Sequence, residues 1–191
     1  MAKNMVKTFV NHPVVELTRV QAVKDGHHFT QYPITTGVGT LENGMLVAAN
    51  HVTGKVLKAS AITEEVYLHA SVEHLYNGEG RDQFVVNETN DFLPRIYEMQ
   101  VGDTFETNAV VFDNTATTGY AIAGTIATIF TTVAATLAVP TAVYATVCVE
   151  TGFTGYTELL AASPTAGIIL QVTKVITLPN GKKGFEFIVT K

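Results

Sequence analysis

Apolar and polar residues alternate along several stretches of the chain, which is the pattern of β-strands with one buried face. Residues 66–73 alternate cleanly, with Val66, Leu68 and Ala70 on one face, and residues 104–111 show the same two-residue period. We therefore expect a half-buried strand in each of these two segments.

Paired apolar runs on either side of turn residues predict β-hairpins. The expected hairpins span residues 14–34 around Asp25-Gly26, residues 45–59 around a loop at 50–54, and residues 168–190 around Pro179-Asn180-Gly181. Residues 156–162 are expected to form one short helix before Ser163-Pro164. Together these segments predict a chain made mainly of antiparallel strands.

The composition points the same way, with 28 Thr and 25 Val against 3 Ser in 191 residues. β-Branched side chains lose rotamer freedom in helices and pack well on pleated sheets. Hydrophobic residues make up 47% and charged residues 15%, which argues against disorder and for a buried core. We predict an all-β fold, a barrel or sandwich of antiparallel strands, with at most one or two short helices.

The N-terminus is expected to be organised differently from the rest. Residues 1–12 lack turn residues and end at His12-Pro13, where the residue before proline avoids the helical conformation. We predict an extended arm over residues 1–12 and a single β-rich domain over residues 13–191, because no repeat or flexible linker divides the chain.

The predicted arm carries apolar side chains ahead of the first convincing strand, at Met5, Val6, Phe9 and Val10. A short terminal segment cannot bury such side chains by itself, and termini are disordered unless something holds them. These four residues are therefore the candidate interface with another protein, for example through a strand added to a sheet edge. The alternative is that the arm folds back onto its own domain.

Residues 114–149 contain no charged residue and are rich in Thr and Ala, so they are predicted to be an insertion in the domain. Within them, Tyr120–Val139 is apolar enough for a membrane span, and Ile122, Ile126 and Ile129 begin a helical stripe. Five threonines, Pro140 and the lack of basic flanks argue against a span. Strands are the favoured interpretation, and a buried or interface helix is the next. We expect this segment to be buried in the domain or against a neighbouring subunit, and no membrane to be involved.

Charge excludes some functions. The chain has 12 basic and 17 acidic residues, and no Lys or Arg lies between Arg95 and Lys174. A nucleic-acid partner needs clustered cations, and the only adjacent pair is Lys182-Lys183, in a predicted turn. We expect no direct nucleic-acid binding. The N-terminus does not resemble a signal peptide, and the single Cys148 is predicted to be a small buried hydrophobe.

No arrangement of residues in the sequence indicates catalysis or a bound cofactor. The six histidines lack the spacing of a metal site, and His27-His28 would point to opposite faces of a strand. No serine lies in a nucleophile motif and no glycine-rich phosphate loop occurs. We therefore predict no enzyme, no cofactor and no metal, although carboxylates paired only in space would escape this search.

Three stretches resemble small structural proteins of tailed-bacteriophage heads. They are Thr63-Glu-Glu-Val-Tyr-Leu-His-Ala-Ser-Val-Glu-His-Leu-Tyr76, Leu93-Pro-Arg-Ile-Tyr-Glu-Met-Gln-Val-Gly-Asp-Thr-Phe-Glu-Thr-Asn108 and Leu170-Gln-Val-Thr-Lys-Val-Ile-Thr-Leu-Pro-Asn-Gly181. The three stretches make up about a fifth of the chain. The resemblance implies a capsid decoration protein, also called an auxiliary or cement protein. Such a protein binds the outside of an assembled head and stabilises it, and it has no active site.

The resemblance implies a partner and a location. The partner would be the lattice of the major capsid protein, with neighbouring copies or a homo-oligomer adding contacts, and Met5, Val6, Phe9 and Val10 would lie at the interface. The protein would be made in the host cytoplasm and end on the capsid surface of the virion. The alternative function is a non-enzymatic β-rich module that binds a ligand or a carbohydrate.

Overall fold

The computed structural model describes residues 3–25, 32–61, 65–71, 85–87, 93–115, 125, 128–139 and 141–191. Among the described residues, strands make up 40% and helices 9%, and the sheets are mainly antiparallel. The predicted all-β class with two short helices is therefore confirmed. An arm that stands apart from the domain is not shown.

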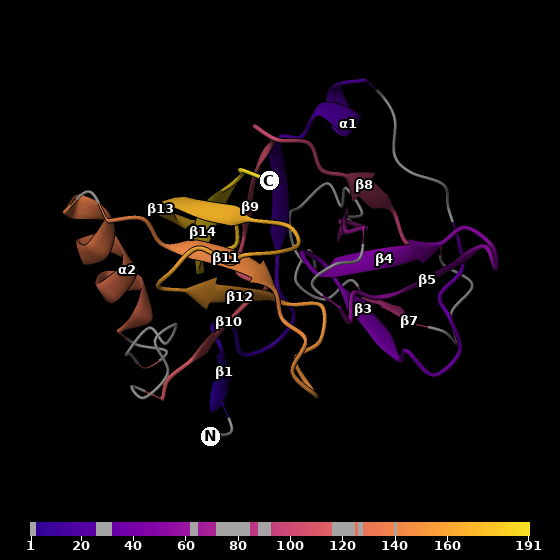
Figure 1. Ribbon diagram of the computed structural model, residues 1–191, viewed down its shortest axis with the longest axis horizontal. Helices are drawn as coiled ribbons and strands as arrows, with labels where there is room; N and C mark the ends of the chain where they lie inside the picture. The colour runs from indigo at the N-terminus through magenta and orange to yellow at the C-terminus, as the bar shows by residue number, and fades with distance from the viewer. Residues whose placement is uncertain are drawn as a thin grey trace.

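Strands and helices follow one another along the whole described chain (Figure 1). The strands are β1 (Met5–Lys7), β2 (Val15–Arg19), β3 (Thr40–Glu42), β4 (Leu46–Asn50), β5 (Lys55–Lys58), β6 (Tyr67–His69), β7 (Val85–Asn87), β8 (Ile96–Glu98), β9 (Thr104–Thr107), β10 (Val110–Asp113), β11 (Tyr144–Val147), β12 (Thr157–Leu160), β13 (Leu170–Thr177) and β14 (Lys183–Val189). The helices are α1 (Gln21–Lys24) and α2 (Ile129–Ala138).

The largest sheet has eight strands in the order β1-β10-β12-β11-β13-β14-β9-β2. All its pairs are antiparallel except β10 with β12. β9 and β10 follow each other in the chain with only Asn108 and Ala109 between them, yet each lies second from an opposite end of this order. The sheet must therefore curl until its two ends meet, as in a barrel.

The seam where the ends meet is held by hydrogen bonds between residues 8–14 and the corner at 107–110. The Thr8 N–H donates to the Val110 carbonyl at 2.9 Å, and the Thr107 Oγ1 hydroxyl donates to the Val14 carbonyl at 2.7 Å. The Val14 N–H donates to the Asn108 side-chain oxygen at 2.7 Å. These bonds satisfy backbone groups that the bend removes from regular pairing.

A smaller four-stranded sheet, ordered β5-β4-β6-β8, lies beside the curled sheet, with β3 and β7 paired next to it (Figure 1). The two parts meet closely at Gly44, where φ is +81° and an added Cβ would lie 2.3 Å from the Thr107 Oγ1 atom. Only glycine combines this backbone conformation with so short an approach. Gly44 thus fixes how the β3–β4 turn sits against β9.

The interior of the curled sheet is filled by aromatic side chains. Phe105 and Phe187 stack with their ring centroids 5.5 Å apart, and both are fully buried. α2 covers part of this core, because Ile129 and Val133 are fully buried and Phe130 stacks on Phe185 at 4.9 Å. Burial of such aromatic groups is a main contribution to the stability of a β domain.

Two of the three predicted hairpins are confirmed. β4 pairs with β5 antiparallel, from Val47 with Lys58 to Asn50 with Lys55. β13 pairs with β14 along their lengths, and Gly181 in the turn has a φ of +76°. In both cases the two strands lie next to each other in the sequence, so local turn chemistry decides the pairing.

The expected hairpin at residues 14–34 is wrong. The first run ends as a strand at Arg19 and continues as α1, whose Gln21 N–H donates to the Asp103 carboxylate at 3.0 Å. β2 pairs with β9 instead of with the second run, and Ile34 forms a bridge with Val56. Gly26 and residues 27–31 lie outside the described residues.

Other expected elements also differ in the structure. Residues 104–111 are two strands in place of one, because the chain turns at Asn108 and Ala109. β6 is buried on both faces, with Tyr67 at 2% and His69 at 0% exposure, so it is not the half-buried strand expected. Residues 157–160 form strand β12 in place of the expected helix.

The uncharged segment 114–149 combines a helix and a strand. Residues 129–138 form α2, so the favoured strand interpretation is wrong there. β11 lies between β12 and β13 in the middle of the large sheet, so this end of the predicted insertion is part of the domain core. Among the described residues, no helix has the length and apolar character needed to cross a membrane. Within Tyr120–Val139, residues 120–124, 126 and 127 lie outside the described residues.

Candidate functional site

The N-terminal segment forms an edge of the large sheet. β1 pairs antiparallel with β10, so that Met5 lies opposite Asp113 and Val6 opposite Phe112. β1 is the end strand of the order, and its outer edge pairs with no strand that the structure describes. An edge of this kind offers unpaired N–H and C=O groups to another chain.

Phe9 and Val10 are neighbours with opposite surroundings. Phe9 is 8% exposed and packs against Tyr156 with the ring centroids 5.4 Å apart, whereas Val10 is 90% exposed. Met5 and Val6 are half-buried. The expectation that the arm cannot bury its apolar side chains in its own domain is therefore wrong for Phe9, and Val10 is the apolar residue that remains outside.

Behind Phe9, a polar network ties the arm to Glu42 of strand β3. The Lys7 ammonium group lies over the Phe9 and Tyr156 rings and donates to the Tyr156 hydroxyl at 3.1 Å. That hydroxyl donates to the Glu42 carboxylate at 2.5 Å, and His12 contacts the other Glu42 oxygen at 3.2 Å. Burial and the hydrogen bond to the Glu42 carboxylate raise the pKa of the Tyr156 phenol. This network fixes residues 7–12 in place.

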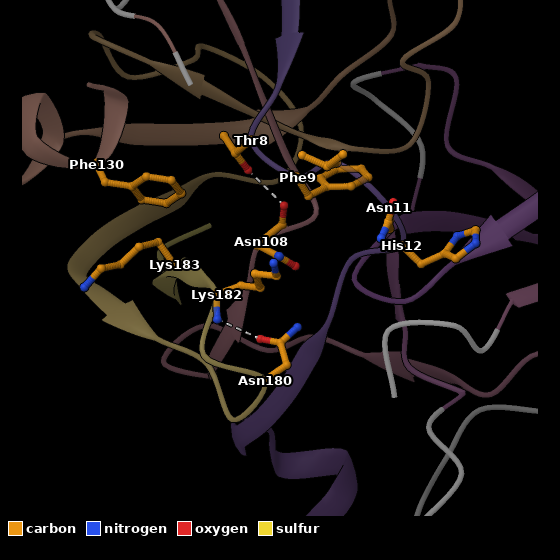
Figure 2. A pocket seen from close by; sticks show the side chains of 10 residues that line it. Thr8, Phe9, Asn11, His12, Asn108, Phe130, Asn180, Lys182 and Lys183 are labelled. Carbon is orange, nitrogen blue, oxygen red and sulfur yellow. Dashed lines mark hydrogen bonds between the residues drawn. The ribbon is translucent and has the colours of Figure 1, made fainter. Parts of the chain in front are cut away.

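Next to this network lies a hollow of about 120 Å³, called the arm hollow below. Four parts of the chain converge on it: residues 8–12, the β9–β10 corner, α2 and the β13–β14 turn (Figure 2). Its lining residues are Thr8, Phe9, Val10, Asn11, His12, Asn108, Phe130, Asn180, Lys182 and Lys183. Two of the four predicted interface residues, Phe9 and Val10, therefore lie at this hollow.

Asn108 is the buried polar residue of the arm hollow, at 3% exposure. Its Oδ1 atom accepts the Val14 N–H at 2.7 Å, and its backbone carbonyl accepts the Thr8 hydroxyl at 2.9 Å. Because Oδ1 is an acceptor here, the other side-chain atom is the Nδ2 amide donor. No described residue accepts a hydrogen bond from Nδ2.

The charge of the arm hollow comes from the β13–β14 turn. The Lys182 N–H donates to the Asn180 side chain at 3.1 Å, and this bond sets the turn. Figure 2 shows the Lys182 side chain directed toward Asn108, while Lys183 lies beneath Phe130 and its ammonium group donates to Thr177 at 3.0 Å. The described residues that line the hollow include no Asp or Glu.

A buried histidine and serine elsewhere have the geometry of a dyad. The His69 Nδ1–H donates to the Glu42 carbonyl at 2.9 Å, so Nε2 is the acceptor of the Ser71 hydroxyl at 2.8 Å. Ser71 in turn accepts the Arg95 N–H at 2.8 Å. His69 is 0% and Ser71 5% exposed, and burial lowers the pKa of His69 to about 4. The pair therefore holds three backbone segments together, away from solvent.

The remaining candidate residues can be placed in the same way. Cys148 is fully buried, as predicted, and burial raises the pKa of its thiol to about 12. His12 and His69 both contact Glu42, one at its carboxylate and the other at its carbonyl, and His51 lies against the Tyr32 ring. His27, His28 and His74 are outside the described residues. Within the described ranges, no three His, Cys, Asp or Glu side chains gather as metal ligands would.

The chain was compared with protein-family models, with curated protein sequences and with solved structures. None of the three comparisons finds a match.

Sequence reasoning found some parts of the arm hollow and missed others. Phe9 and Val10 were among the predicted interface residues, and Lys182-Lys183 stood out as the adjacent basic pair. Asn108 was missed, because its partners Val14 and Thr8 are 94 and 100 residues away. The alternation of residues 104–111 continues through Asn108, so no local signal marks this residue.

Proposed function

We propose that the chain is a structural virion protein that binds the assembled capsid lattice of a tailed phage and stabilises the head. The observation that carries this proposal is the N-terminal edge: the open side of β1, the half-buried Met5 and Val6, and the exposed Val10 lie together on one segment. The resemblance to phage head proteins supplies the partner, the lattice of the major capsid protein.

The physical basis of the contact is strand addition. β1 has only three residues, and one of its edges pairs with no described strand, so a strand from a capsid subunit or a neighbouring copy can extend the eight-stranded sheet there. The Lys7–Tyr156–Glu42 network holds the segment in place before binding, which reduces the ordering cost on association. Each bound copy then adds free energy only to the assembled lattice.

Two further observations support a structural role over an enzymatic one. The buried side chains of His69 and Ser71 serve backbone groups of the fold. The stretches that carry the resemblance contain β6, β8, β9 and β13, so the likeness lies in the scaffold. The proposal includes no catalytic residue, cofactor, metal or nucleic-acid contact, and it places the protein on the capsid surface after synthesis in the host cytoplasm.

The test uses heads assembled from the major capsid protein encoded in the same genome. The wild-type chain is expected to cosediment with these heads to saturation. Val10→Asp should weaken the binding about tenfold, because it puts a charge into the contact. The matched control is Val52→Asp, since Val52 is 97% exposed in the β4–β5 loop, outside the N-terminal segment.

The outcomes distinguish the head-binding function from the position of the contact on the chain. Failure of the wild-type chain to bind the heads would contradict the proposed function. Equal binding by wild type, Val10→Asp and Val52→Asp would leave the head-binding function in place and show that the N-terminal edge is not the contact. Thermal melts of both variants should match the wild type, because both valines are exposed.

One observation favours the alternative function, a non-enzymatic ligand- or carbohydrate-binding module. A polar cavity of about 270 Å³ is lined by Lys7, Thr40, Glu42, Lys58, Gly152, Thr154 and Tyr156. Burial lowers the pKa of Lys58, and no ion pair to Lys58 occurs among the described residues. A glycan array probed with the labelled protein tests this alternative: specific binding abolished by Lys58→Met would support it, and an array without signal would contradict it.

A further inference from the structure

We infer that the arm hollow is a carboxylate-binding site, and that its occupant is an Asp or Glu side chain on an acidic, partly apolar peptide segment of a partner protein. This inference deepens the proposed function, and it rests on that function only for the identity of the partner as a capsid subunit. The residues that line the hollow support the carboxylate-binding site independently of that function.

The first argument is the donor of Asn108. The residue is 97% buried, and its Oδ1 is committed to the Val14 N–H at 2.7 Å, so Nδ2 cannot exchange places with Oδ1. The Nδ2 group opens onto the hollow, and no described residue accepts a hydrogen bond from it. An occupant that supplies an acceptor oxygen would bond this donor, and an ionised oxygen would form the stronger, charge-assisted bond.

The second argument is charge. The whole chain carries a net charge of −5, yet the described lining of the arm hollow has Lys182 and Lys183 and no carboxylate. Two lysines elsewhere form ion pairs, Lys3 with Glu158 at 2.7 Å and Lys174 with Glu186 at 3.0 Å. Lys182 has no such partner in the described part of the chain. An ionised acceptor between Lys182 and Asn108 would form charge-assisted hydrogen bonds with both.

The third argument is shape and polarity. Phe9 and Phe130 form apolar walls, Val10 stands exposed at the hollow, and the space of about 120 Å³ suits one acidic side chain with its methylene groups. A nucleic-acid backbone is not favoured, because it needs a row of cations and only Lys182 is directed toward Asn108. An apolar neighbour of the acidic residue would pack on Val10.

The test is an NMR titration of the full ¹⁵N-labelled chain, observed at the Asn108 side-chain amide. The probes are a peptide of alternating Glu and Leu, the same peptide with Gln in place of Glu, and inorganic phosphate. The Glu peptide is expected to shift the Asn108 NH₂ signals saturably, and both other probes to bind about tenfold more weakly or not at all. Lys182→Gln should weaken the Glu peptide about fivefold, as expected for one lost charge contact.

Two variants complete the design. Lys24→Gln is the matched control, because Lys24 is exposed on α1 and the change in net charge is identical. Asn108→Asp keeps the acceptor for the Val14 N–H but replaces the donor by an oxygen, so it should abolish peptide binding. A melting curve close to that of the wild type shows that this variant is folded, and Lys182→Gln carries the test if it is not.

The inference is overturned by equal shifts with the Glu and Gln peptides, by phosphate binding as tightly as the Glu peptide, or by unchanged affinity in Lys182→Gln. Binding to heads is measured separately. Peptide binding without head binding would leave the site in place and contradict the proposed function. Head binding that survives in Asn108→Asp and Lys182→Gln would contradict this site as the capsid contact and leave the proposed function in place.

Discussion

His69 and Asn108 are both buried polar side chains that hold together segments far apart in the sequence, and they differ in how many of their hydrogen-bonding atoms are in use. Both ring nitrogens of His69 are bonded, one to the Glu42 carbonyl and one to the Ser71 hydroxyl. Asn108 uses its side-chain oxygen on Val14 and keeps its amide donor unused by described residues.

The difference teaches how to separate structural polar groups from those available to a ligand. A fully bonded buried group stabilises the fold, and a ligand could reach it only by breaking those bonds. A buried group with one unused donor, at the base of an open hollow, keeps its remaining bond for an incoming acceptor. Burial alone does not distinguish the two, since both residues are at most 3% exposed.

The largest expected effect is on the His69 side. His69→Leu removes the bonds to Glu42 and Ser71 and leaves a carbonyl and a hydroxyl buried without their partner. The free energy of unfolding should fall by about 4 kcal/mol, measured by urea denaturation. Ser71→Ala should cost less, about 2 kcal/mol, because the hydroxyl's partners keep other bonds or gain water. A loss below 1 kcal/mol for His69→Leu would show that the bonded histidine is not structural.

The pH dependence of stability should reveal the burial of His69. Burial lowers the pKa of His69 to about 4 from an ordinary 6.5, so the unfolded chain binds this proton more readily than the folded one. Stability is unaffected by His69 above pH 6.5 and falls as the pH decreases toward 4, by about 3 kcal/mol in total. The slope between pH 6.5 and 4 should be shallower in His69→Gln than in the wild type. Parallel slopes would contradict a neutral buried histidine.

Among the residues that line the arm hollow with Asn108, Phe9 should contribute to the stability of the fold and Val10 should not. Phe9→Ala removes a ring that packs on Tyr156, and we expect a loss of about 3 kcal/mol. Val10→Ala should change stability by less than about 0.5 kcal/mol, because Val10 is 90% exposed. Chemical denaturation of the two adjacent variants checks this, and equal losses would mean that Val10 is also packed.

Substitution of Thr157 should have the smallest effect on stability, and this effect should be stabilising. Its hydroxyl is fully buried and has no hydrogen-bond partner in the described structure, so it lacks even the single bond of Asn108. Thr157→Val replaces the hydroxyl by a methyl group in strand β12 and should raise the melting temperature by about 2–4 °C, equivalent to about 1 kcal/mol. A lower melting temperature would show that the hydroxyl is satisfied by bound water.

The sequence could predict the parts of the fold in which pairing is local. The β4–β5 and β13–β14 hairpins follow from apolar runs separated by short turns, and the β-branched composition indicates the fold class. The hairpin at residues 14–34 failed because the Asp103 carboxylate, 82 residues away from Gln21, receives the α1 N–H. Residues 157–160 have a helix-compatible pattern, but pairing with β10 and β11 makes them a strand.

The candidate site was predictable only in part, for a related reason. An exposed Val10 and a buried Phe9 have the same apolar character in the sequence, and only the position of Tyr156 decides which one is covered. The unused Asn108 donor depends on Val14 occupying its oxygen. Both facts arise from contacts between segments about a hundred residues apart, which no local pattern records.

The placement of β9 and β10 next to the opposite end strands of the large sheet has a consequence for the folding of the chain. β1 cannot pair until β10, which lies more than a hundred residues later in the chain, has been synthesised. β9 is paired on both sides only after β14 at the C-terminus has been synthesised. Such non-local pairings are slow to form, typically over milliseconds to seconds. Until the last strand arrives from the ribosome, the half-built sheet has unpaired edges that promote aggregation. We therefore expect refolding yields to fall with rising protein concentration, and a chain ending before residue 183 to accumulate in inclusion bodies.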